Sequence, residues 1–238
     1  MKTIFNFLMI AAICTVLGGC KSSQKSAQGE KLNDKQLTSQ SEKQVTQLQK
    51  QIDKKYSDAK AHYELGKIYH REGSWDKAEW EYSKALAFDP VHHESQASIV
   101  KLYSDKGDKQ RGDVLAEQYI NQASISAKNS LLLGRSFQDR GLDEYALTCY
   151  TQSHRLAPNS VVVNKQLGYH YLLKGDNANA EIYLRRAFEL DPYQPGVAGQ
   201  LGKLGVQVEI PKKAKDLKKL EKKKQVSGEG QVDTSGLQ

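Results

Sequence analysis

The stretch YELGKIYHREGSWDKAEWEYSKALAFDP, residues 63–90, is repeated in outline by KQLGYHYLLKGDNANAEIYLRRAFELDP, residues 165–192. The two stretches lie three periods of 34 residues apart, and the same period recurs between them. It is marked by four glycines and four aromatic residues, which are Gly73, Gly107, Gly141 and Gly175, and Tyr69, Tyr103, Phe137 and Tyr171. Such a fixed spacing indicates a protein built from internal repeats.

The recurring residues have mechanical roles in a helix–turn–helix unit. Leu65-Gly66 and Leu167-Gly168 put a small residue where the two helices of a unit come closest. The glycine of each turn tolerates backbone angles that other residues resist. Small residues of the second helix supply the other side of the contact, namely Ala78, Ala146 and Ala180. Pro90 and Pro192 end the second helix, because proline cannot continue it.

With this content, the 34-residue period resembles the tetratricopeptide repeat. The resemblance covers residues 59–194 and implies an all-α fold, an α-solenoid of about four repeats with the bounds 59–92, 93–126, 127–160 and 161–194. Stacked repeats need polar caps, because an exposed terminal repeat would leave an apolar face in water. Apolar residues recur at helical spacing in 41–58 and 195–211, so we expect one capping helix in each range.

The second repeat departs from the pattern. Val100 stands where the small residue belongs, Gly112 replaces the alanine and Ser124 replaces the proline. We therefore expect the second helix of this repeat to be shifted or irregular. The residues expected to face inward instead are Ala116, Ile120 and Ala123.

The N-terminus has the pattern of a targeting segment. Lys2 gives a basic start, and Ile4–Leu17 is almost wholly apolar. This run is too short for a spanning helix, which needs ~20 residues, but it suits the core of a signal peptide. The residues Leu17-Gly18-Gly19-Cys20 resemble the lipobox of bacterial lipoproteins. The resemblance implies that residues 1–19 are a lipoprotein signal peptide and that Cys20 carries lipid, including palmitate.

Lipidation of Cys20 would anchor the protein on a membrane, since stable anchoring needs more than one acyl chain. Lys21 follows Cys20, and by analogy with the family this favours the outer membrane, with the domain facing the periplasm. Residues 20–40 are polar and rich in Ser, Gln and Lys, which predicts a flexible tether. Two alternatives stay open: Cys20 as an ordinary buried thiol, and a conventional secreted leader.

The charge of the chain is concentrated in one segment. The formal net charge is +7, and Lys212–Lys224 alone holds eight Lys against Asp216 and Glu221. A basic segment outside the folded repeats does not indicate nucleic-acid binding by those repeats. Residues 212–238 are predicted to form a Lys-rich disordered tail. Lys212–Lys224 is interpreted either as a solvated tail or as a basic helix on anionic lipid.

No catalytic constellation is present in the sequence, so we expect neither enzyme activity nor a cofactor. There is no phosphate-binding glycine loop and no nucleophile elbow. His92-His93-Glu94 resembles a metal cluster, but adjacent side chains point to different faces of a helix, so no metal site is predicted. Cys149 is predicted to be a small hydrophobic filler rather than a reactive thiol.

The resemblance also implies where a partner would bind. In tetratricopeptide repeats the first helix lines a concave groove, and its second and ninth positions face a bound peptide. The predicted groove residues, with the fifth positions included, are Lys60, Tyr63, Lys67, Lys101, Lys128, Arg135, Lys165 and Tyr169. This cationic row is either a solvated face or a groove for an acidic or carboxylate-ended segment. It lacks the asparagines of the carboxylate clamp found in chaperone co-factors.

Together these features predict an outer-membrane lipoprotein that holds a repeat scaffold in the periplasm and binds partner proteins of the cell envelope. The chain resembles the repeat lipoproteins of pilus and secretion machines, such as the tight-adherence pilus assembly lipoprotein and type IV pilotins. A pore-forming secretin, or another component of such a machine, would then be the partner, with no nucleic acid bound. The alternative is a cell-wall adaptor that recruits murein hydrolases or synthases. A cytoplasmic RNA-binding repeat protein would require Cys20 to be unmodified.

Overall fold

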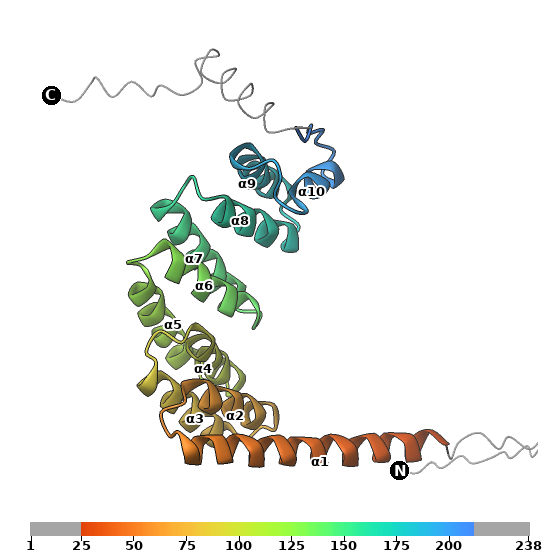
Figure 1. Cartoon of the computed structure of the whole chain (residues 1–238), viewed down its shortest axis with the longest axis vertical. Helices are drawn as coiled ribbons and strands as arrows, with labels where there is room; N and C mark the ends of the chain where they lie inside the picture. The colour runs from red at the N-terminus through yellow and green to blue at the C-terminus, as the bar shows by residue number, and fades with distance from the viewer. Residues whose placement is uncertain (1–24, 212–238) are drawn as a thin grey trace, which may run out of the picture. The chain divides into compact units, whose positions relative to one another are not determined.

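The computed structural model describes residues 25–211. In this part of the chain the helices α1 to α10 succeed one another (Figure 1). The chain divides into two compact units, Met1–Gln47 and Leu48–Gln238. The predicted signal peptide, Cys20 and the tail 212–238 lie outside the described residues. Among residues 25–211, no helix combines the length and the apolar character needed to cross a membrane.

The first helix, α1, spans Lys25–Lys54 and begins inside the segment predicted to be a flexible tether. Lys, Glu and Gln are good helix formers, and this range contains no proline to interrupt the hydrogen-bond ladder. Helix propensity therefore extends the helix beyond the predicted start at residue 41. Ile52, near its C-terminal end, is buried.

Four pairs of helices follow α1, one pair in each predicted repeat. Their bounds are α2 Ala59–Arg71, α3 Trp75–Phe88, α4 His93–Asp105, α5 Lys109–Ala123, α6 Ala127–Gln138, α7 Asp143–Leu156, α8 Val161–Leu173 and α9 Asn177–Leu190. A short last helix, α10, spans Val197–Lys203. The residues described contain helices and no strands, so the predicted all-α solenoid of helix–turn–helix repeats is confirmed.

The turns between paired helices use the glycines that define the period. Gly73, Gly107, Gly141 and Gly175 have φ angles of 72°, 81°, 70° and 74°. These positive angles are costly for residues with a Cβ atom, which explains why glycine recurs at this position. Polar side chains cap the start of two of the four second helices, α5 and α9. Asp108, for example, accepts a hydrogen bond of 3.2 Å from the backbone N–H of Arg111 at the start of α5.

The second helix of repeat two corrects one prediction. Helix α5 is a regular α-helix that starts at Lys109, one period after Trp75 and one period before Asp143, so it is not shifted. Gly112 is buried, and a Cβ atom there would lie 3.3 Å from the carbonyl oxygen of Val100. Glycine on α5 thus compensates for the larger Val100 on α4. Ala116 and Ala123 are buried as predicted.

Three apolar clusters hold the pairs together. One joins repeats one and two around Tyr82 and Leu102, the second joins repeats two to four around Phe137 and Tyr150, and the third joins α9 to α10. Cys149 lies in the second cluster and is 0 % exposed, which confirms its role as a filler. Burial raises the pKa of its thiol to about 12, so the thiol stays protonated.

Candidate protein-binding groove

A cavity of about 530 Å³ lies along the first helices of repeats one and two and the end of α6. These helices are neighbours, since α2 packs against α4 and α4 against α6. Three of the lining residues, Tyr63, Lys67 and Lys101, are among those that the resemblance assigned to a groove. They are Tyr63, Lys67, His70, Arg71, Tyr82, Glu94, Ser98, Lys101, Asp105, Asp139 and Arg140, and we call this cavity the concave groove.

Arg140 spans the concave groove. It follows α6, and its guanidinium donates to Ser98 on α4 at 2.7 Å and to the hydroxyl of Tyr63 on α2 at 2.8 Å. It also donates to the carbonyl oxygen of Ser136 at 2.6 Å. All three acceptors are neutral, and no carboxylate of the described residues lies within ion-pair distance of this guanidinium. Its positive charge is therefore held in place without being neutralised.

The two lysines of the concave groove, which belong to the predicted cationic row, are paired with acidic residues. Lys67 donates to Glu64 at 2.9 Å, one helical turn away on α2. Lys101 forms an ion pair with Asp105 on α4. Including Glu94 and Asp139, the lining combines four cationic side chains with three carboxylates. The groove thus presents a mixed charge pattern with Arg140 as its unneutralised centre.

His70 connects the rim of the concave groove to its floor. Its Nε2 atom lies 3.1 Å from a carboxylate oxygen of Asp105, and its Nδ1 atom lies 3.3 Å from the hydroxyl of Tyr82. Burial raises the pKa of Tyr82 above its ordinary value, so this group remains a neutral hydroxyl. The contact orders Asp105, which in turn holds Lys101.

The sequence of the helix pairs matches a known family. Residues 59–92 and 166–194 fit the family model described as Tetratricopeptide repeat. The chain contains tetratricopeptide repeats. No curated protein sequence matches the chain. Tetratricopeptide repeats are protein-interaction scaffolds and are typically not enzymes, which agrees with a groove lined mainly by side chains of α2 and α4.

Solved structures of repeat proteins resemble the chain at low sequence identity. MamA from residue 41 of Desulfovibrio magneticus RS-1 is 17 % identical, with 73 % of this chain and 98 % of that one covered and a TM-score of 0.38. PilF of Pseudomonas aeruginosa is 22 % identical, with coverages of 61 % and 67 % and a TM-score of 0.38. PilW, titled a widely conserved type IV pilus biogenesis factor, is 15 % identical, with coverages of 86 % and 94 % and a TM-score of 0.39. These TM-scores are below 0.5, so the likenesses do not bear on function.

Within the tetratricopeptide domain, only some of the predicted groove residues are brought together. Tyr63, Lys67 and Lys101 line the concave groove. Arg135 donates to the Gln166 amide at 3.2 Å, and Lys165 donates to that of Gln194 at 2.9 Å. Arg135 and Lys165 do not line the concave groove, and nor do the remaining three. Lys60 and Lys128 are exposed on α2 and α6, and Tyr169 is half-buried against the apolar cluster of α9 and α10.

Arg140 was not among the groove residues predicted from the sequence, although a repeated pattern in the sequence does mark its position. A cationic residue precedes the turn glycine in three of the four repeats, as Lys106-Gly107, Arg140-Gly141 and Lys174-Gly175. This position lies outside the helical positions that the family resemblance assigns to the groove. The same period that identified the glycines would have identified these cations. In residues 25–211, no three His, Cys, Asp or Glu side chains are grouped so as to hold a metal ion.

Proposed function

We propose that the protein is an outer-membrane-anchored periplasmic scaffold that binds partner proteins in the assembly of a pilus or secretion apparatus. The anchoring part of the proposal rests on the sequence Leu17-Gly18-Gly19-Cys20 and the apolar run before it. The binding part rests on the concave groove of the tetratricopeptide domain. The two parts are tested separately, because they involve different residues.

The observation that carries the binding proposal is the state of Arg140. A guanidinium that is hydrogen-bonded to Ser98, Tyr63 and a backbone carbonyl, with no carboxylate partner in the part of the chain that the structure describes, is preorganised for an anion. A carboxylate from a bound segment would form charge-assisted hydrogen bonds there, which are roughly twice as strong as neutral ones. The hydroxyl groups of Ser98 and Tyr63 can then rotate to donate to the same carboxylate. The partner segment therefore carries an acidic side chain or a free C-terminus at this point.

The remaining charges of the concave groove restrict which acidic segments fit. Glu94 and Asp139 would repel a segment that is acidic throughout, whereas Arg71 favours a second acidic group near the end of α2. Like-charge contacts add to specificity, because they disfavour wrong partners. We therefore expect a partner segment of mixed charge, with one carboxylate at Arg140.

The anchoring part is tested by metabolic labelling of cells with an alkyne analogue of palmitate. The wild-type chain is expected to be labelled and to fractionate with the outer membrane. Cys20→Ser should remove the label and release the protein from the membrane fraction. Labelling that persists in this variant would contradict lipidation at Cys20.

The binding part is tested by photo-crosslinking in living cells from Lys67 and Lys101. The matched control is Arg155, which is exposed on α7 and does not line the concave groove. Capture of a secretin or a pilus component from both groove positions, and not from Arg155, would support the proposal. Capture of a murein hydrolase or synthase would replace it with the cell-wall adaptor. Capture from Arg155 alone would show that the concave groove is not the binding surface.

A further inference from the structure

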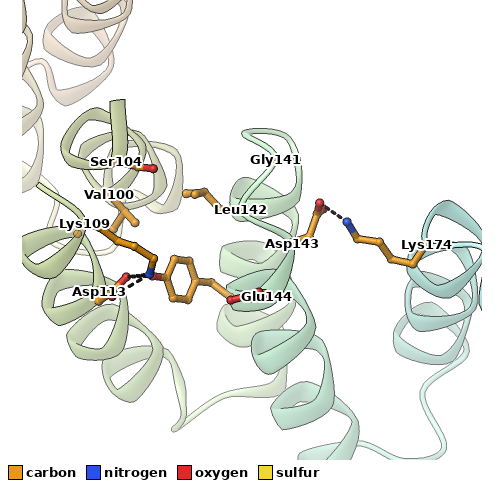
Figure 2. Close-up of a pocket in the computed structure, with 11 residues that line it drawn as sticks. Val100, Ser104, Lys109, Asp113, Gly141, Leu142, Asp143, Glu144 and Lys174 are labelled. Carbon is orange, nitrogen blue, oxygen red and sulfur yellow. Dashed lines mark hydrogen bonds and ion pairs between the residues drawn. The ribbon is translucent and has the colours of Figure 1, made fainter. Parts of the chain in front are cut away.

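A second cavity, of about 270 Å³, opens between repeats two and three on the edge of the domain where the turn glycines lie. Figure 2 shows Lys109 and Asp113 of α5 on one wall, and Asp143 at the start of α7 facing Lys174, which follows α8. The lining residues are Val100, Ser104, Lys109, Gly112, Asp113, Gly141, Leu142, Asp143, Glu144, Tyr145 and Lys174. We call this cavity the turn-edge pocket.

The junction between repeats one and two shows how the chain itself fills the equivalent position. Lys106, which precedes the turn glycine of repeat two, donates to Glu79 at 3.1 Å and to Asp76 at 3.2 Å on α3. Glu79 also accepts a hydrogen bond of 2.6 Å from Tyr103. Burial alone would raise the pKa of Glu79, but the hydrogen bonds from Tyr103 and Lys106 outweigh burial and lower the pKa overall, so the carboxylate stays charged. At the junction of repeats three and four, Lys174 likewise pairs with Asp143.

The junction between repeats two and three lacks this contact. Arg140 lies one period after Lys106, but its guanidinium is directed into the concave groove. Asp113 lies one period after Glu79. It accepts hydrogen bonds of 2.7 and 2.8 Å from Lys109 of its own helix, and one from the hydroxyl of Tyr145 on α7. Asp113 therefore has no cationic partner from repeat three, whereas Glu79 has Lys106 from repeat two.

The space is open because two large side chains are missing from this junction. At the first junction the rings of His70 and Trp75 pack edge to face, with centroids 5.5 Å apart. One period later these positions hold Ser104 and Lys109, both of which line the turn-edge pocket. Loss of an imidazole and an indole leaves room for one long side chain.

The lining of the turn-edge pocket favours a cation on an apolar stem. Three carboxylates, those of Asp113, Asp143 and Glu144, face two ammonium groups. Asp143 is paired with Lys174, but Glu144 forms no ion pair with any other residue of the described part. The methylene groups of a long cationic side chain would pack on Val100 and Leu142, as lysine stems do on apolar surfaces.

We propose that the turn-edge pocket binds a lysine or arginine side chain of a partner protein through Asp113 and Glu144. The guest cation takes the place that Lys106 occupies at the preceding junction. This site is distinct from the concave groove and does not depend on what the concave groove binds. The turn-edge pocket would bind a cationic side chain of a partner, whereas the concave groove would bind an acidic one.

The proposal is tested on the full chain with a lysine probe, Nα-biotinyl-Gly-Lys-Gly-amide, and a zero-length carbodiimide cross-linker that joins an amine to a nearby carboxylate. Mass spectrometry then measures the probe attached to each carboxylate. We expect labelling of Asp113 and Glu144 to saturate with probe concentration and to exceed that of Glu117 about fivefold. Glu117 is an internal control, since it is exposed on α5 and does not line the turn-edge pocket. Acetyl-lysine methylamide should compete, whereas acetyl-norleucine methylamide should not.

Two sets of variants separate binding at this pocket from general reactivity. Combining Ser104→His with Lys109→Trp restores the side chains of the first junction and should reduce the labelling of Glu144 to the level of Glu117. Glu144→Gln should lower the labelling of Asp113 about threefold, while Glu117→Gln should leave it unchanged. Melting temperatures show whether each variant is folded. If the double variant does not fold, the comparison of Glu144→Gln with Glu117→Gln is enough to test the proposal. Labelling that is linear in probe concentration and equal at Glu117 and Glu144 would overturn the proposal, as would equal competition by the norleucine compound.

Discussion

The guanidinium of Arg140 donates a hydrogen bond of 2.8 Å to the hydroxyl of Tyr63, although 77 residues separate the two in the chain. The contact joins repeat three to repeat one across repeat two, where Ser98 accepts a further bond from the same side chain. In a solenoid each repeat contacts mainly its neighbours, so a link that skips one repeat adds cooperativity between non-adjacent units. It also fixes the floor of the concave groove before any partner arrives.

Arg140→Gln should therefore affect both stability and binding. Loss of the three hydrogen bonds from a charged donor should lower the free energy of unfolding by about 1–3 kcal/mol. It should also abolish the cross-links from Lys67 and Lys101 to an acidic partner segment. Urea denaturation and photo-crosslinking measure the two effects. Arg155→Gln, an exposed change on α7, is the matched control and should stay within about 0.5 kcal/mol of the wild type. Unchanged stability together with unchanged cross-links in Arg140→Gln would show that the Arg140 contacts do not form in solution.

The close approach of helices within a repeat gives a second prediction, at Gly134 on α6. A Cβ atom at this position would lie 2.6 Å from Cε1 of Tyr150, whose side chain is fully buried and cannot move aside. Gly134→Ala should lower the free energy of unfolding by about 1–3 kcal/mol through overpacking. Gly199→Ala in α10 is the control, because no atom of the described residues lies within 4 Å of its Cβ position. The control should be neutral or up to about 1 kcal/mol more stable, since alanine favours helix over glycine. Equal stability of both variants in urea would refute the packing argument.

The repeat architecture could be predicted because a single spacing links several residue types with separate mechanical roles. The turn glycine, Gly141 in repeat three, and the core aromatic residue, Phe137 in the same repeat, both have counterparts every 34 residues. The irregular helix expected in repeat two was wrong because Gly112 faces Val100 across the helix pair, and the loss of space at one residue is offset at the other. Such compensation depends on which residues meet, and the spacing along the chain does not reveal it.

The concave groove was only partly predictable for a similar reason. Its helices and the lysines on them follow from the period, whereas the direction of a side chain depends on the acceptors around it. Lys106 and Arg140 occupy the same position in successive repeats, yet Lys106 turns to Glu79 and Arg140 turns to Ser98. The pairing of Lys101 with Asp105 was visible in the sequence as a spacing of four residues on a helix.

His170 on α8 makes the stability of the domain depend on pH. Its side chain is 1 % exposed, and burial lowers the pKa of its imidazole below the ordinary value. Asp143 opposes this shift and Lys174 adds to it. Between the folded pKa and the unfolded value of about 6.5, the unfolded chain binds a proton that the folded chain does not. The free energy of unfolding should therefore fall as pH drops through about 6.5 and level off below the folded pKa.

Urea denaturation at a series of pH values between neutral and mildly acidic measures this slope. His170→Gln should be less stable at neutral pH, since it leaves a cavity beside Tyr150, but its stability should change less over this range. Carboxylates with lowered pKa values, such as Asp176 and Asp191, lose their stabilising effect only at more acidic pH. His154→Gln on α7 controls for the loss of an imidazole from a partly exposed position. Identical slopes for His170→Gln and the wild type would rule out His170 as the titrating group.

The three cysteines of the sequence allow burial and lipidation to be tested in one titration. Cys149 is 0 % exposed and its raised pKa keeps the thiolate scarce, so the folded protein isolated from the cell envelope should show no thiol that reacts with a disulfide reagent. After unfolding in urea, one thiol should react, because Cys14 would be removed with residues 1–19 and the sulfur of Cys20 would carry lipid. Cys149→Ser should reduce that number to zero. Two or three reactive thiols in the unfolded wild type would contradict the proposed processing at Cys20, whereas a thiol that reacts rapidly in the folded protein would contradict the burial of Cys149.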